Sequence, residues 1–236
     1  MAYCAALTLN DASGKALYTI RYAGMPDCNP AALCNQLRDD AQVLLAKRND
    51  LKVILLCDGA PELWNLLRSA FSEEALGVTI YELVDIWHLL EKLAIVTSLL
   101  GGPSGSHFLL MRWKKMLLND PDGAGKIFEE LLDSGQQHVK VGKDRPVDQA
   151  MCYIANHNAG MDYATAREHG LPIGSGNIEA TCKTLFEVRM KRSGSRWKET
   201  TGEQIVRLRA LASSDRWETT LPMVFSQLQK VAQIAA

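Results

Sequence analysis

Residues 172–179, Pro-Ile-Gly-Ser-Gly-Asn-Ile-Glu, are the stretch from which the fold of this chain can be inferred. The two glycines around Ser175 predict a tight turn, and Ser175 or Asn177 could accept hydrogen bonds from the free N–H groups of a helix that follows. Glu179 then falls in the first turn of that helix. A carboxylate in this position, beside exposed backbone, is well placed to bind a divalent ion or to act as a base.

A strip of cations follows Glu179. Apolar residues at helical spacing between 178 and 186 predict a helix with one buried face. The cations and one tryptophan, together called the basic strip, are Lys183, Arg189, Lys191, Arg192, Arg196, Trp197 and Lys198. A carboxylate next to such a strip suits an enzyme acting on a polyanion, with a metal to polarise a phosphate and cations to hold the backbone. The alternative is a solvated helix with ordinary i, i+4 pairs through Glu187, preceded by a plain Gly-Ser-Gly loop.

Composition limits the class of protein. A chain of 236 residues can build one domain, or one domain carrying an insertion, and an apolar fraction of 47% is ordinary for a globular protein. Because the net charge is only −1, affinity for nucleic acid must come from local clustering. The six scattered cysteines contain no C-x-x-C pair, which favours a reduced cytosolic protein and argues against a zinc site. We expect no signal peptide and no membrane span.

The first half of the chain predicts a mixed sheet. Residues 2–9 and 17–22 indicate a hairpin, with Asp11 as a turn former between them. A helix with Asn29 as N-cap and Pro30 at its first position then leads to the apolar run at 51–57, typical of a buried parallel strand.

Two aspartates follow predicted strands. Asp58 comes directly after the strand at 51–57, at the edge where open α/β sheets place ligand sites, and Asp85 follows a further strand at 77–84. Asp85 and His88 are three residues apart at the head of a helix that runs to about residue 100, so their side chains can share one face. The alternatives are an N-cap role for Asp85 and a packing or supporting role for His88.

Beyond a glycine-rich break at 101–105, the signals are helical, around 108–118, 124–132 and 147–155. Two further helices, 203–211 and 217–234, close the chain. Four histidines lack ligand spacing, and we interpret them as surface or loop residues: His107, His138, His157 and His169.

These elements predict a mixed-sheet α/β fold of the ribonuclease H-like kind, with a helical insertion and C-terminal helices. In that architecture metal-binding carboxylates gather from the first strand, the fourth strand and a late helix. Asp58 fits the fourth strand and Glu179 fits the late helix. We expect residues 1–100 to form the N-terminal part of the core, 101–170 the insertion, and 171–236 the C-terminal helices.

Four blocks of the sequence carry a family resemblance. They resemble, in order and over nearly the whole chain, the blocks of bacterial DDE insertion-sequence transposases of the ISKra-type group. The blocks are Leu-Cys-Asp-Gly-Ala at 56–60, Asp-Ile-Trp-His at 85–88, Gly-Ser-Gly-Asn-Ile-Glu at 174–179 and Arg-Met-Lys-Arg-Ser-Gly-Ser-Arg-Trp at 189–197.

The resemblance implies a role for each of these residues. Asp58 and Glu179 become the second and third members of an Asp-Asp-Glu triad that binds two Mg²⁺ or Mn²⁺ ions. Asp85 and His88 match an Asp-x-x-His signature that supports the site or handles DNA ends. The turn that presents Glu179 is shaped by Gly174, Ser175 and Gly176. Implied partners are transposon ends, target DNA, and a second copy or a full-length transposase, in a bacterial cytoplasm at the nucleoid.

The same resemblance predicts an incomplete site. In the family, the first aspartate lies on a strand that precedes the segment matching residues 2–9, so we expect this chain to lack that aspartate and that strand. We therefore expect the chain to be a transposase by descent and inactive alone. Two alternatives to a catalytic core remain. One is a non-catalytic DNA-binding or oligomerising remnant that keeps the basic strip, and the other is a structure-specific nuclease on the same architecture.

Overall fold

The computed structural model describes residues 2–26, 28–190 and 196–235 of the chain. The chain divides into two compact units. Unit 1 combines the two ends of the sequence, residues 1–49 and 176–236, and unit 2 is the continuous segment 50–175.

Unit 1 is built from one hairpin and the terminal helices. Its elements are β1 (Tyr3–Asn10), β2 (Ala16–Gly24), α1 (Pro30–Lys47), α9 (Gly176–Cys182), the π-helix η2 (Lys183–Glu187), α10 (Val188–Met190), α11 (Glu199–Ala212) and α12 (Trp217–Ala235). β1 and β2 pair antiparallel, from Tyr3 opposite Gly24 to Asn10 opposite Ala16. Asp11 accepts hydrogen bonds from the backbone N–H groups of Ser13 and Lys15 at 2.8 and 3.0 Å, which confirms its role as a turn former.

Helix α1 starts where the sequence predicts. The Asn29 side chain accepts a hydrogen bond from the Ala31 N–H at 3.0 Å, and Pro30 occupies the first turn, as predicted. Elsewhere in unit 1, β2, η2 and α11 share a small apolar core. Its buried members are Ala23, Leu185, Val206 and Ala210.

Unit 2 holds a parallel strand pair and most of the helices. Its elements are β3 (Val53–Cys57), α2 (Pro61–Ala70), α3 (Glu73–Leu76), β4 (Ile80–Val84), α4 (Ile86–Leu100), α5 (Gly102–Asn119), α6 (Gly123–Asp133), α7 (Pro146–His157), the 3-10 helix η1 (Asn158–Gly160) and α8 (Tyr163–Glu168). β3 and β4 pair parallel with Cys57 opposite Val84, so Asp58 and Asp85 leave the same edge of the pair. The Asp85 N–H donates to the Cys57 carbonyl at 2.8 Å.

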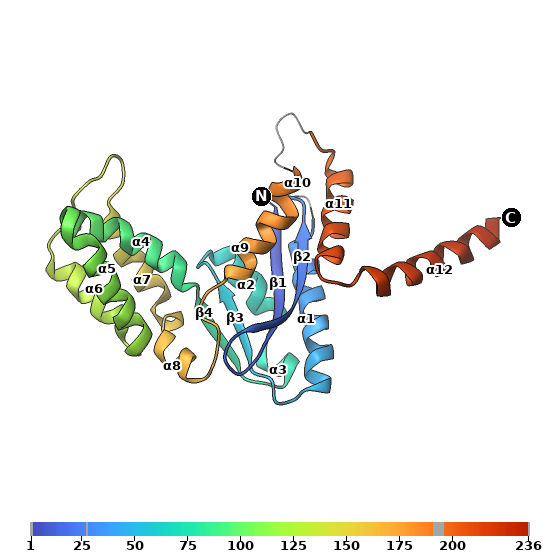
Figure 1. Cartoon of the computed structure of the whole chain (residues 1–236), viewed down its shortest axis with the longest axis horizontal. Helices are drawn as coiled ribbons and strands as arrows, with labels where there is room; N and C mark the ends of the chain where they lie inside the picture. Colours follow the sequence, from blue (N-terminus) through green and yellow to red (C-terminus); the bar gives the residue numbers. More distant parts are fainter. Residues whose placement is uncertain (1, 27, 191–195, 236) are drawn as a thin grey trace. The chain divides into compact units, whose positions relative to one another are not determined.

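Helices α4 to α8 pack together within unit 2 (Figure 1). Side chains from α4, α5, α6 and α7 are fully or almost fully buried between them, because each helix presents one apolar stripe to the others. The largest are Leu89, Leu93, Trp113, Leu117, Ile127, Leu131 and Ile154. A smaller cluster of Leu83, Ala166 and Leu171 packs with residues of β3 and β4.

The mixed α/β class predicted from the sequence is confirmed in this coarse form. The predicted mixed sheet is not seen among the described residues, whose strands form two separate two-stranded sheets, β1 with β2 and β3 with β4. Local details differ as well. Helix α5 begins at Gly102, inside the segment predicted to be a break, and α8 was not predicted. The division at residues 100 and 170 stays a prediction. None of the described helices combines the length and the apolar character that crossing a bilayer would require.

We expect Leu93→Ala to lower the free energy of unfolding by about 2–5 kcal/mol, because Leu93 is 0% exposed and its truncation leaves a cavity between packed helices. Ile95→Ala, two residues along the same helix, is the control, since Ile95 is 58% exposed. Urea unfolding followed by circular dichroism measures both. Equal losses in the two variants would contradict the packing described for α4.

Candidate functional site

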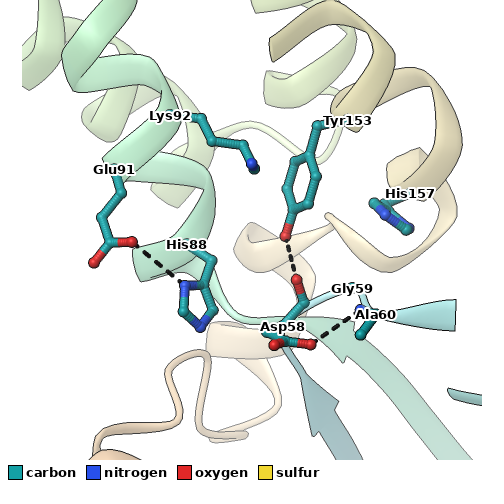
Figure 2. A pocket seen from close by; sticks show the side chains of 8 residues that line it. All are labelled: Asp58, Gly59, Ala60, His88, Glu91, Lys92, Tyr153 and His157. Carbon is teal, nitrogen blue, oxygen red and sulfur yellow. Dashed lines mark hydrogen bonds and ion pairs between the residues drawn. The ribbon is translucent and has the colours of Figure 1, made fainter. Parts of the chain in front are cut away.

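A pocket of about 350 Å³ opens beside Asp58 in unit 2. We call it the Asp58 pocket (Figure 2). It is lined from three directions: the turn after β3, the first two turns of α4, and the last turns of α7. Its lining residues are Asp58, Gly59, Ala60, His88, Glu91, Lys92, Tyr153 and His157.

Asp58 is exposed and only partly engaged. Its Oδ1 accepts a hydrogen bond from the Ala60 N–H at 3.0 Å and lies 3.5 Å from the Cys57 sulfur. Its Oδ2 accepts no hydrogen bond from any described residue. The backbone carbonyl of Asp58 accepts a 2.7 Å hydrogen bond from the Tyr153 hydroxyl (Figure 2). The residue is therefore held by its backbone while one carboxylate oxygen stays open to a ligand.

The turn that carries Asp58 requires a glycine. Gly59 has φ = +92°, a backbone conformation that residues with a Cβ rarely adopt. A Cβ at this position would lie 3.0 Å from His157 Nε2 and 3.1 Å from the Tyr153 hydroxyl oxygen. Helix α7 therefore packs closely against the turn, and a side chain on residue 59 would push it away.

Partial burial and neighbouring charges shift the pKa values of several side chains in and beside the pocket. The Lys92 ammonium lies 4.7 Å from the centroid of the Tyr153 ring, close enough for a cation–π interaction. Burial lowers the pKa of His157, a shift that Asp58 opposes and Lys92 reinforces. Burial, followed by the neighbouring Asp58 carboxylate, raises the pKa of the Tyr153 hydroxyl, so it stays a hydrogen-bond donor at neutral pH. The same two causes raise the pKa of the Cys57 thiol to about 11.

Asp85 is buried and serves as the N-cap of α4. It is 2% exposed, and its Oδ1 accepts a hydrogen bond from the Trp87 N–H at 2.9 Å. Its other carboxylate oxygen accepts a hydrogen bond from the Ser175 hydroxyl. The N-cap interpretation of Asp85 is therefore confirmed. His88, one helical turn later, lines the Asp58 pocket, with its Nδ1 3.4 Å from a carboxylate oxygen of Glu91.

The segment before Gly176 is attached to the start of α4. The Ile86 N–H donates to the Ile173 carbonyl at 3.1 Å. A Cβ on Gly174 would lie 2.6 Å from Trp87 Nε1, so only glycine fits there without a shift of the indole. Ser175 reaches Asp85 as described. Gly174 thus allows this segment to pack closely against α4, and Ser175 hydrogen-bonds to its N-cap. The sequence pattern did not predict these roles.

Glu179 lies in the first turn of α9 and is exposed, as predicted. Helix α9 starts at Gly176, and the nearby Asn177 side chain donates to Thr8 Oγ1 at 3.3 Å in β1. Asp58 belongs to unit 2 and Glu179 belongs to unit 1. Among the residues that the structure describes, no cluster of three or more His, Cys, Asp or Glu side chains is arranged to hold a metal ion.

The basic strip is described in part. Residues 191–195, which include Lys191 and Arg192, lie outside the described residues, as does the side chain of Arg189. The cations Lys183, Arg196 and Lys198 are exposed, and Trp197 is half-buried. Exposed cations near Glu179 are compatible with a DNA-facing strip and with a solvated helix alike.

Four lining residues of the pocket lie outside the sequence blocks and were not predicted as site residues: Glu91, Lys92, Tyr153 and His157. We expected His157 to be a surface or loop residue, and this is corrected: it ends α7, is half-buried and contacts the Asp58 turn. Tyr153 and His157 are four residues apart on one helix, and their rings meet edge to face with centroids 4.8 Å apart. That spacing is the only local signal. Nothing local connects them with a residue 95 positions earlier.

We expect Gly59→Ala to destabilise the protein more than Gly77→Ala. Both glycines have positive φ, so each substitution costs about 1–2 kcal/mol of backbone strain. A Cβ on Gly77 meets nothing within 4 Å, whereas one on Gly59 crowds two rings of α7, which adds about 1–3 kcal/mol. Thermal unfolding of both variants measures the difference. Equal melting temperatures would show that α7 does not pack against the turn.

We expect Asp85→Ala to lower the free energy of unfolding by about 2 kcal/mol, because α4 loses its cap and the Ser175 hydroxyl loses its acceptor. Asp85→Asn should cost less, since the amide oxygen can still accept from the Trp87 N–H. Chemical denaturation measures both variants. If Asp85→Ala unfolds with the same free energy as the parent chain, Asp85 does not stabilise α4 as its N-cap.

Comparisons with known proteins complete the description of the site. A scan against protein-family models, a search of curated proteins and a search of solved structures each found no match. The candidate site is therefore described from the residues of this chain alone. It consists of an open carboxylate at the end of β3, surrounded by aromatic and cationic side chains from two helices.

Proposed function

We propose that the chain is the catalytic-core portion of a DDE-type transposase with a ribonuclease H-like fold, acting on DNA phosphodiester bonds by two-metal cleavage and strand transfer. The observation that supports this most is the setting of Asp58. Its carboxylate stands at the carboxyl end of a parallel strand, in a pocket, with Oδ2 free of hydrogen bonds from the described residues. The four sequence blocks that resemble transposases include this residue.

The donor chemistry fits a divalent metal. Carboxylate oxygens are the ligands that Mg²⁺ and Mn²⁺ prefer, and Asp58 and Glu179 are both exposed at the ends of elements. In this proposal each supplies one metal-binding carboxylate of the triad. Bound metal ions would make a water or hydroxyl group nucleophilic and stabilise the leaving oxygen at phosphorus.

The remaining residues have supporting roles in the proposal. Tyr153 holds the Asp58 backbone through its hydroxyl, which fixes the carboxylate against the end of β3. Asp85 caps α4 and so positions His88 at the pocket. The basic strip would contact the phosphates of transposon ends and target DNA, and the working location would be the bacterial cytoplasm at the nucleoid.

A second candidate is a non-catalytic DNA-binding or oligomerising remnant of such an enzyme. Exposed Lys183, Arg196 and Lys198 favour it, because exposed cations are available to contact DNA phosphates. Such a remnant would bind DNA with salt-sensitive affinity and would require neither Asp58 nor Glu179.

Metal binding separates the two candidates without requiring activity. In a Mn²⁺ titration followed by electron paramagnetic resonance, we expect Asp58→Asn and Glu179→Gln each to weaken binding by about 10- to 100-fold or more, because each removes a ligand. Glu218→Gln is the matched control. Glu218 is also an exposed glutamate in the first turn of a helix, α12, and its replacement should leave Mn²⁺ binding unchanged.

Two results would decide against the catalytic proposal. If Mn²⁺ binding is the same in all variants, neither carboxylate is a ligand. If Mg²⁺-dependent nicking of plasmid DNA is observed and survives both Asp58→Asn and Glu179→Gln, the chemistry belongs to other residues. DNA binding without any Asp58-dependent metal binding would support the remnant.

A further inference from the structure

Lys92 is the one lysine or arginine among the residues that line the Asp58 pocket. It is half-buried and forms no ion pair with any described residue. Neither carboxylate of the pocket forms an ion pair with Lys92: Asp58 Oδ1 accepts from the Ala60 N–H while Oδ2 stays open, and Glu91 faces the His88 imidazole. A cation held in a pocket without a carboxylate partner is available for an anionic ligand.

Tyr153 connects this cation to Asp58. Its ring face lies 4.7 Å from the Lys92 ammonium, and its hydroxyl donates to the Asp58 carbonyl at 2.7 Å (Figure 2). One side chain therefore contacts both the Lys92 ammonium and the backbone of Asp58. His88 lies four residues before Lys92 on α4, so its imidazole shares the same face of the helix and lines the same pocket.

We propose that the Asp58 pocket binds a backbone phosphate of the DNA strand through Lys92, with Tyr153 as the residue that positions Lys92. The inference rests on the proposed function, because it takes DNA as the polyanion. It adds a phosphate-binding site that lies apart in the sequence from the basic strip.

A strand phosphate fits the pocket better than a small free anion does. The pocket is open and is lined on one side by the exposed Asp58 carboxylate, which repels an anion unless a divalent ion neutralises it. A polymer that is held at many other phosphates can place one more beside Lys92, whereas a free anion would have to bind there alone.

The experiment compares two lysines with the same local geometry. Lys114 lies 4.7 Å from the Trp87 ring centroid, as Lys92 does from Tyr153, but Lys114 does not line the pocket. Lys92→Met and Lys114→Met therefore remove the same charge and the same kind of contact. Binding of a fluorescein-labelled DNA duplex is followed by anisotropy over a range of salt concentrations, with Ca²⁺ in place of Mg²⁺.

We expect Lys92→Met to weaken binding about tenfold and to reduce the slope of log K against log salt by about one, since one phosphate contact is lost. Lys114→Met should match the parent chain, and Lys92→Arg should restore the slope. Thermal unfolding of the two methionine variants should be alike, which separates lost binding from lost folding.

The inference is overturned if Lys92→Met keeps the parent slope, if Lys114→Met lowers it equally, or if the parent chain does not bind the duplex. Competition by inorganic phosphate at an affinity equal to that of the duplex would assign the pocket to a free anion instead. A failure of the parent chain to bind the duplex would count against the proposed function as well. The other outcomes concern Lys92 alone, because the proposed function is tested separately by the dependence of metal binding and cleavage on Asp58 and Glu179.

Discussion

Asp85 is buried and links three parts of unit 2: the end of β3, the start of α4 and Ser175. Its backbone N–H completes the pairing of β4 with β3, its Oδ1 caps α4, and its other oxygen accepts from Ser175. A carboxylate that is 2% exposed is costly unless hydrogen bonds satisfy it, and here the same bonds that satisfy it set the direction of α4. The placement of His88 and Lys92 at the pocket depends on this arrangement, because both stand in the first two turns of that helix.

Asp58 and Asp85 show how neighbouring positions at one sheet edge acquire different roles. Both follow parallel strands whose last residues, Cys57 and Val84, are paired. Asp85 is buried and has a partner for each carboxylate oxygen, which makes it structural. Asp58 is exposed and has one oxygen without a partner among the described residues, which leaves it able to bind a ligand. Local hydrogen bonding, rather than sequence position, separates the two.

The helical bundle of unit 2 contributes directly to the candidate site. Helix α7 is packed into the bundle by Val147, Ala150 and Ile154, and this rigid attachment carries Tyr153 to the Asp58 turn. Gly59 allows the close approach because it has no side chain. Helix α7 thereby supports the carboxylate at the end of β3.

The sequence by itself determined the elements and the first candidate residues. Alternation and turn chemistry predicted the hairpin and the role of Asp11 in its turn. Asn29 and Pro30 predicted the start of α1, and the apolar run before Asp58 predicted a parallel strand. Each of these signals acts over a few neighbouring residues. The pocket was decided by tertiary structure. The contact of Tyr153 with Asp58 spans 95 positions, Ser175 reaches Asp85 across 90, and His157 had been interpreted as a surface residue. Such contacts depend on how helices pack, and packing depends on the shapes of many side chains at once, so no local pattern in the chain could specify them.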